Sequence, residues 1–289
     1  MTATTPTLPS LLAAARAGGY AIPAFNVVDV ATMDGVLRAA RGCDSPVIVQ
    51  TAAVTARTWG PGTLAAAFRT LRIELRATAI LQLDHCDQLD LIHACLDAGW
   101  DAVLFDGAGL DPEDNLRQTR AVVARAHEIG AAVEGELESI GGFEPGASVM
   151  TRPSASLDAN LRFIDETGID CFAPAIGNVH GRSAAPVVLD LDRVRQLATG
   201  TRVALALHGG TGIADDTMRD LIAAGCSKVN VSTAIREACA TALRAGSQDA
   251  GRRIDPLTSL VAMRDAAQAV ALEVMAKLGS VGQAPSNET

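Results

Sequence analysis

Three of the five histidines in this 289-residue chain stand at or just beyond the ends of short apolar segments. These are His85, His180 and His208, whereas His93 and His127 lie within segments that have a helical pattern. Three neutral imidazoles that leave a fourth position open are typical of a catalytic zinc site. Histidines in clefts also act as bases or as hydrogen-bond donors, so position alone leaves both roles open.

An aspartate stands directly before the first of these histidines. Asp84 could act as a general acid or base beside a metal, or it could cap the helix that follows. Asp87 also precedes that helix and suits the cap better. This interpretation leaves Asp84 available for chemistry.

Further carboxylates stand near the ends of two other apolar segments. Glu134, Glu136 and Glu138 alternate along the chain, so they share one face of a strand. Burying carboxylates on a parallel strand is costly unless cations or protons compensate for their charge. We therefore expect Glu136, close to the strand end, to lie near a metal or substrate, and Asp106 is a second candidate of this kind.

Two glycine- or hydroxyl-rich segments have the residue types that bind phosphate. One is His-Gly-Gly-Thr-Gly at residues 208–212, and the other is Val-Asn-Val-Ser-Thr at residues 229–233. Each opens a helical pattern, and backbone N–H groups at a helix N-terminus bind anions directly. Glycine also lets the backbone approach a ligand closely. The two segments together predict a phosphate site.

These residues are positioned by a repeated alternation of short apolar segments and helical patterns. The apolar segments are mostly continuous, as strands covered on both faces are. They span residues 20–27, 46–50, 79–83, 102–105, 131–137, 171–175, 203–207 and 228–231. Eight strand–helix units predict an α/β fold of the (β/α)8 TIM-barrel type, in which the C-terminal strand ends meet at one opening. A doubly wound open sheet is the alternative, but the first segment is not followed by GxGxxG.

We expect residues 1–289 to form a single barrel domain with an addition at each end. Residues 1–18 would supply a helix that caps the bottom of the barrel, and residues 252–280 would form additional C-terminal helices. Residues 139–156 contain three glycines and two prolines and are predicted to form a long loop. A long loop in a compact barrel is usually a lid or a binding loop.

The composition excludes several classes of protein. The net charge of −9 argues against a nucleic-acid-binding protein, which needs a basic surface. The apolar segments are too short to span a membrane, and the N-terminus has no signal-peptide pattern, so we expect a cytoplasmic protein. The six cysteines form no CxxC pairs and are predicted to be reduced thiols.

From about residue 20 to residue 282, the chain resembles the class II (zinc-dependent) ketose-bisphosphate aldolases, which include the fructose- and tagatose-bisphosphate aldolases. The segments that carry this resemblance are AFN (24–26), SPVI (45–48), LDH (83–85), FDG (105–107), EDN (113–115), VEGEL (133–137), GG (141–142), GNVHG (177–181), LHGGTG (207–212) and KVNVST (228–233).

The resemblance implies a role for each candidate residue near the metal. The three strand-end histidines, His85, His180 and His208, would ligate the catalytic Zn²⁺. Asp84 would exchange a proton with the aldehyde oxygen. The remaining carboxylates would be Glu136 near the metal, Asp106 at a position for a second cation, and Glu144 as the base that removes the substrate proton.

The resemblance also implies how the donor substrate, dihydroxyacetone phosphate, is held. The substrate-binding residues would be Asn26, Gly181, Gly209, Gly210, Thr211, Asn230, Ser232 and Thr233. Members of the family often bind a monovalent cation, Na⁺ or K⁺, beside the phosphate. Ala108, Glu138 and Arg182 depart from the family pattern, and we expect such departures to affect the acceptor aldehyde more than the metal chemistry.

The implied activity is the reversible cleavage of a ketose 1,6-bisphosphate to dihydroxyacetone phosphate and an aldehyde such as glyceraldehyde 3-phosphate. It would proceed through an enediolate stabilised by the metal, as in glycolysis and related carbohydrate metabolism. A Schiff base is not required, and the chain has only two lysines, of which Lys228 heads the eighth apolar segment, at the end away from the site. The alternatives are another ketose phosphate or a deoxy-keto acid phosphate as substrate, a barrel isomerase, and a non-catalytic partner subunit. A homodimer or homotetramer is expected.

Overall fold

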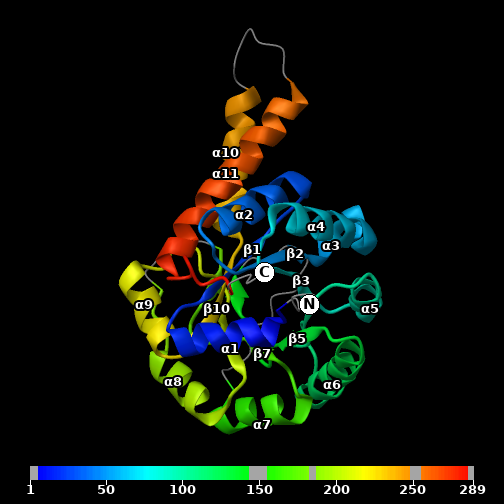
Figure 1. The fold of residues 1–289 in the computed structure, drawn as a ribbon. Helices are drawn as coiled ribbons and strands as arrows, with labels where there is room; N and C mark the ends of the chain where they lie inside the picture. Colours follow the sequence, from blue (N-terminus) through cyan, green and yellow to red (C-terminus); the bar gives the residue numbers. More distant parts are fainter. Residues whose placement is uncertain (1–5, 143–154, 182–186, 248–254, 286–289) are drawn as a thin grey trace.

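Eight parallel strands form a closed barrel, so the predicted (β/α)8 fold is confirmed (Figure 1). The computed structural model describes residues 6–142, 155–181, 187–247 and 255–285. Around the barrel, the order of the strands is β1, β2, β3, β4, β5, β7, β9 and β10. Their bounds are Ile22–Asn26, Val47–Ala52, Ala79–Cys86, Ala102–Phe105, Ala132–Gly135, Cys171–Phe172, Ala204–Leu207 and Cys226–Val231. Each of the eight predicted apolar segments therefore contains or overlaps one barrel strand.

Helices surround the barrel, and local signals in the sequence account for several of their ends (Figure 1). α6 begins at Pro112, and the side chain of Asp111 accepts a hydrogen bond from the backbone N–H of Glu113. The surrounding helices are α2 (Val30–Gly42), α3 (Ala53–Trp59), α4 (Pro61–Leu75), α5 (Leu89–Asp97), α6 (Pro112–Glu128), α7 (Leu157–Thr167), α8 (Leu191–Gly200) and α9 (Asp215–Ala223). Their apolar faces cover the outward-facing strand residues and form the main core.

The first helix, α1 (Leu8–Gly18), lies across one end of the barrel (Figure 1). Its buried residues Leu8 and Leu12 belong to a second apolar cluster, together with inward-facing residues from the beginnings of the strands, such as Ile22 and Ile48. This cluster fills the N-terminal end of the barrel. A polar active site therefore has room only at the opposite end of the barrel, where the strands terminate.

The last two helices, α10 (Thr233–Ser247) and α11 (Pro256–Lys277), pack against each other and project away from the barrel (Figure 1). α11 also packs along α2. The sequence predicts additional helices over residues 252–280, and the described part of that segment, residues 255–280, contains one long helix, α11. Among the residues that the structure describes, no helix is long and apolar enough to cross a membrane.

Two very short strands add a feature that the sequence analysis did not anticipate. β6 (Gly141–Gly142) pairs in parallel with β8 (Val179–His180), outside the barrel sheet. The predicted long loop thus begins with a strand. Two of the predicted functional residues, Glu144 and Arg182, lie outside the described residues.

Candidate active site

The three predicted histidines meet at the C-terminal opening of the barrel. The ring centre of His85 lies 4.9 Å from that of His180 and 4.7 Å from that of His208, and the latter two centres are 5.6 Å apart. One ring nitrogen from each histidine lies within 4.8 Å of the others. All three rings are close enough to share one metal ion.

A bulge in β3 brings two neighbouring residues into the site. Leu83 pairs with Val103 on β4, but the next pairing joins Cys86 to Phe105, so β3 contains one extra residue. His85 lies in this interval with a φ of 38°, in the left-handed region that non-glycine residues seldom adopt. Neighbouring side chains on a regular strand point to opposite faces of the sheet. The bulge changes this alternation, so the side chains of Asp84 and His85 both lie at the same site.

The other two histidines depend on the small sheet and on a glycine. β8 carries His180 and passes close to Gly209, directly after His208. Gly209 has a φ of 72°, and a Cβ built on it would lie 2.0 Å from the carbonyl oxygen of Val179. Only glycine therefore allows the two histidine-bearing segments to approach this closely.

Carboxylates orient two of the imidazole rings. Nε2 of His208 lies 2.8 Å from Oε1 of Glu134, and Nδ1 of His85 lies 3.2 Å from Oδ2 of Asp106. A carboxylate accepts the hydrogen on the nitrogen it faces, so the other ring nitrogen keeps its lone pair. Those nitrogens, Nδ1 of His208 and Nε2 of His85, are buried and have no hydrogen-bond partner among the described residues. Unsatisfied buried acceptors of this kind fit a metal ion.

The pKa values also indicate a site that accepts positive charge. Burial and the two neighbouring imidazoles lower the pKa of His180 to about 2, so its ring stays neutral. Burial, followed by the nearby Asp106 carboxylate, raises the pKa of Glu136 well above its ordinary value. Burial opposes protonation of His85, yet Asp84 and Glu136 outweigh this effect and raise its pKa. A divalent cation would supply the charge that these groups attract.

A second set of possible ligands shares one histidine with the first. His85, Asp106 and Glu136 also have ligand atoms within 4.8 Å of one another. Glu136 lies between the rings, with Oε1 3.7 Å from Nδ1 of His85 and Oε2 3.9 Å from Nδ1 of His208. Glu138 lies elsewhere and accepts hydrogen bonds from the backbone N–H groups of Ala155 and Ala175.

Asp84 belongs to a closed ring of buried hydrogen bonds. Its Oδ2 accepts from Nδ2 of Asn26 at 2.7 Å, and its Oδ1 accepts from Nδ2 of Asn230 at 3.3 Å. Gln50 donates to Oδ1 of Asn26 at 2.9 Å, and Nζ of Lys228 donates to both Gln50 and Asn230. The ammonium group of Lys228 can only donate, so the side chains of Gln50 and Asn230 turn their oxygens towards it. Their NH₂ groups therefore point towards the other members of the hydrogen-bonded ring. Asp84 is therefore held as an acceptor.

The cap prediction for this region is wrong in one respect. Asp87 is exposed, and the residue that precedes α5 is Gln88, whose side chain makes no capping bond. The strand runs on to Cys86, so Asp87 lies too close to its end to cap the helix. Asp84 is not a cap either, because its carboxylate is bonded within the ring.

Lys228 connects this ring of hydrogen bonds to the carboxylate that contacts His208. Its Nζ lies 2.7 Å from Oε2 of Glu134, and both side chains are fully buried. Gln82 donates to the same oxygen at 2.7 Å. Burial disfavours the charge on Glu134, but Lys228 and His208 outweigh burial and lower its pKa. The side chain of Lys228 thus lies inside the barrel, nearer the site than its place at the head of an apolar segment suggested.

Replacing Lys228 by methionine should lower the free energy of unfolding by about 3–5 kcal/mol, because Glu134 would remain buried without its cation. Urea denaturation monitored by circular dichroism measures this change. Lys277→Met is the matched control, since the only other lysine pairs with the exposed Asp215 and its loss should have a much smaller effect. Adding Glu134→Gln to Lys228→Met should restore part of the stability, and an additive further loss would contradict the pairing.

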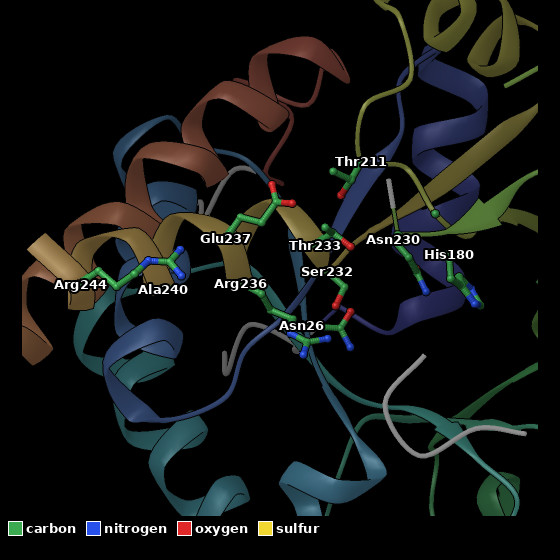
Figure 2. Close-up of a pocket in the computed structure, with 12 residues that line it drawn as sticks. Asn26, His180, Thr211, Asn230, Ser232, Thr233, Arg236, Glu237, Ala240 and Arg244 are labelled. Atoms are coloured by element: carbon green, nitrogen blue, oxygen red, sulfur yellow. The ribbon is translucent and has the colours of Figure 1, made fainter. Parts of the chain in front are cut away.

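A cavity of about 440 Å³ opens beside the histidines (Figure 2). It contains seven of the eight predicted substrate-binding residues, namely Asn26, Gly181, Gly209, Thr211, Asn230, Ser232 and Thr233. Gly210 instead packs against Val229, and its N–H donates to the carbonyl oxygen of Asn230 at 2.9 Å. The cavity adjoins the N-terminus of α10, where backbone N–H groups favour an anion.

Several residues at the site were not predicted to be functional. Gln50, Gln82 and Lys228 lie on barrel strands within apolar segments, and Glu134 was noted only for its alternation. A polar or charged residue inside an otherwise apolar strand is the signal that could have found them, because it must have a partner in the barrel interior.

Comparisons with known proteins match nearly the whole chain to one family. Residues 7–283 match the family model described as fructose-bisphosphate aldolase class-II. Over 240 residues the chain is 34% identical to a 6-phospho-5-dehydro-2-deoxy-D-gluconate aldolase of Halalkalibacterium halodurans, covering 82% of this chain and 83% of the relative. It is also 34% identical over 243 residues to a fructose-bisphosphate aldolase of Streptococcus pneumoniae, covering 82% and 81%. A crystal structure of a putative fructose-1,6-biphosphate aldolase from Coccidioides immitis superimposes with a TM-score of 0.88 at 29% identity, covering 97% of this chain and 98% of that one.

Proposed function

Since the chain belongs to the class II fructose-bisphosphate aldolase family, and is thus an aldehyde-lyase, we propose that it is a zinc enzyme that cleaves a phosphorylated ketose to dihydroxyacetone phosphate and an aldehyde. The observation that carries this proposal is the meeting of three histidines beside a cavity that adjoins a helix N-terminus. Neither feature alone would specify the reaction, since the histidines supply only a metal site and the cavity only an anion site.

His85, His180 and His208 would hold the metal, and their geometry and ligand type favour Zn²⁺. When bound, the ion would act as a Lewis acid that stabilises negative charge on the donor half of the substrate. Glu134 and Asp106 keep two of the rings in the orientation that presents a lone pair. Glu136 and Asp106, which share a set of possible ligand atoms with His85, would assist with a second cation or with movement of the first.

The donor phosphate would lie among Gly209, Thr211, Asn230 and Thr233, at the beginning of α10. Glycine lets the backbone approach the phosphate oxygens, and the helix N-terminus favours their charge. A monovalent cation beside the phosphate, Na⁺ or K⁺, is part of this proposal. It would offset the repulsion between the phosphate and an acidic protein of net charge −9.

Asp84 would move the proton on the acceptor side of the reaction. In cleavage, its carboxylate accepts the proton of the substrate hydroxyl while the neighbouring carbon–carbon bond breaks, and the bonding electrons stay with the donor half. The released fragment is then an aldehyde. The donor carbon is reprotonated in a separate step, which the family resemblance assigns to Glu144.

The identity of the aldehyde separates two versions of this proposal. A ketose 1,6-bisphosphate would release glyceraldehyde 3-phosphate. A deoxy-keto acid phosphate, the kind of substrate in the name of the Halalkalibacterium relative, would release an aldehyde that carries a carboxylate. The family as a whole favours the first, and the equal identity to both relatives keeps the second in the test.

The test is a panel of candidate ketose phosphates, each assayed for dihydroxyacetone phosphate and for the aldehyde released. We expect cleavage of at least one substrate by the zinc-loaded protein, loss of cleavage after chelation, and recovery when zinc is returned. Full activity in a metal-stripped sample would reject the zinc proposal. Absence of triose phosphate from every substrate would favour an isomerase or a non-catalytic subunit.

We also propose that the chain forms a homodimer or homotetramer. The projecting pair α10 and α11 exposes Leu243, Leu257 and Leu260, which suits contact with another copy. Light scattering after size-exclusion chromatography measures the assembly, and a monomer at micromolar concentration would reject it.

A further inference from the structure

Lys228 is fully buried inside the barrel, and the reaction proposed above gives it no role. Its ammonium group has three N–H donors, and it meets three side-chain oxygens. These are Oδ1 of Asn230 at 2.6 Å, Oε2 of Glu134 at 2.7 Å and Oε1 of Gln50 at 3.4 Å. We propose that Lys228 is a positioning residue for the proton transfer at Asp84, and that it acts through the two side-chain amides. This inference rests on the aldolase function proposed above.

The orientation of Asn230 carries the first half of the argument. A side-chain amide presents an oxygen at one end and an NH₂ group at the other, so it can occupy the same space in either direction. Lys228 meets the oxygen, and the NH₂ group of Asn230 consequently faces Oδ1 of Asp84 at 3.3 Å. A reversed amide would place its NH₂ group against the ammonium group and its oxygen against the carboxylate, and both buried contacts would be unfavourable. The bond from Lys228 therefore selects the orientation of Asn230.

Gln50 transmits the same constraint to the other oxygen of Asp84. Its Oε1 faces Lys228, so its NH₂ group donates to Oδ1 of Asn26 at 2.9 Å. The NH₂ group of Asn26 in turn donates to Oδ2 of Asp84 at 2.7 Å. Each oxygen of Asp84 thus receives an N–H donor whose direction is set from Lys228.

The two asparagines lie between Asp84 and the space in which a substrate would bind. Asn26 and Asn230 line the 440 Å³ cavity, and Figure 2 shows both side chains at its wall. Asp84 itself is only 1% exposed, so the direction of its carboxylate depends on the amides around it. A general base must lie within hydrogen-bond distance of the proton that it takes. An amide turned the wrong way would repel Asp84 and displace it from that position.

A variant of Lys228 alone would not separate this role from the ion pair with Glu134. Loss of the ammonium group would leave Glu134 buried without its cation, and Glu134 also orients His208. The comparison is therefore made in the Glu134→Gln background, where the introduced amide oxygen can still accept from Nε2 of His208. Oε1 of Gln82 has no hydrogen-bond partner among the described residues, so Gln82 can turn it towards the introduced NH₂ group.

The experiment compares Glu134→Gln with the double variant Glu134→Gln/Lys228→Met, both loaded with zinc. If Lys228 served only to pair with Glu134, removal of the unpaired ammonium group should leave kcat unchanged or raise it. We expect instead that the double variant has a kcat lower by about 10- to 100-fold for the best ketose phosphate. Its midpoint in urea should be equal or higher, because no buried charge is left unpaired, and its zinc content should be unchanged. Equal kcat values would overturn the inference, and so would a loss of zinc confined to the double variant.

Asp84→Asn tests whether the effect passes through Asp84. In this background the same removal of Lys228 should lower kcat by less than about threefold, because the group that it positions is already lost. An equal fold-loss with and without Asp84 would contradict a positioning role.

Lys277→Met is the matched control, since it removes the only other lysine, which pairs with the exposed Asp215, and it should leave kcat unchanged. The proposal for Lys228 and the aldolase proposal fail in different ways. A wild-type protein that neither cleaves a ketose phosphate nor exchanges the donor's proton with solvent would reject the aldolase proposal itself. An active wild-type protein whose kcat is insensitive to Lys228 in the Glu134→Gln background would reject only the positioning role.

Discussion

Replacement of His208 by alanine is expected to abolish metal binding at the site and to lower the rate of aldol cleavage by about 10³-fold or more. The ring is one of the three imidazoles that converge among the described residues, and it is completely buried beside Glu134. Two remaining ligands bind zinc far more weakly than three. Several kcal/mol of charge stabilisation in the transition state would be lost with the ion.

Zinc per chain, measured by atomic emission after dialysis, and turnover of the best ketose phosphate are the two readouts. His93→Ala is the matched control, because this histidine is exposed on α5 and should leave both values unchanged. Circular dichroism verifies that the variant is folded. A His208→Ala protein that keeps a full zinc complement and its turnover would exclude this histidine as a ligand.

The sequence predicted the barrel well because the relevant signals are local. Continuous apolar segments between helical patterns mark strands that are covered on both faces. Three histidines at the ends of such segments must meet once the barrel closes, since all its parallel strands end at the same opening. The alternation of the glutamates was also a correct sign of charge in the interior, because Glu134 and Glu136 are both buried near the histidines.

Features that depend on pairing between distant segments were not predictable in the same way. The small sheet that carries His180 is made partly of Gly141 and Gly142, which have no strand propensity. The bulge at His85 exists only in relation to the pairing of β3 with β4. Lys228 was placed away from the site because a linear sequence indicates its strand position but not the direction of its long side chain.

Lys228 illustrates why the proposed metal site and the proposed proton-transfer residue, Asp84, have to be considered together. One buried ammonium group contacts Glu134, which orients the ring of His208, and Asn230, which donates a hydrogen bond to Asp84. The positive charge of Lys228 thus lies next to both the histidine cluster and the hydrogen-bonded ring that contains Asp84. This coupling predicts that substitutions around Asp84 will be most informative when metal content is measured alongside turnover.

Asp84 provides the sharpest test of the division between metal and proton chemistry. Asp84→Asn should lower turnover by about 10²-fold or more, because the amide cannot accept the proton of the substrate hydroxyl. Zinc content should stay close to that of the wild type, since Asp84 is bonded to Asn26 and Asn230 and is not one of the three converging ligands.

The exchange of the donor's proton with solvent distinguishes a proton-transfer role from general damage to the site. Incubation of dihydroxyacetone phosphate with the variant in D₂O, followed by NMR, should show exchange at a rate near that of the wild type, because this step involves no aldehyde. Asp87→Asn, an exposed aspartate three positions along the chain, is the matched control for turnover. If exchange and cleavage fell together in Asp84→Asn, Asp84 would act on the donor or on the metal. If neither fell, the proton of the aldehyde oxygen would have to be carried by another group.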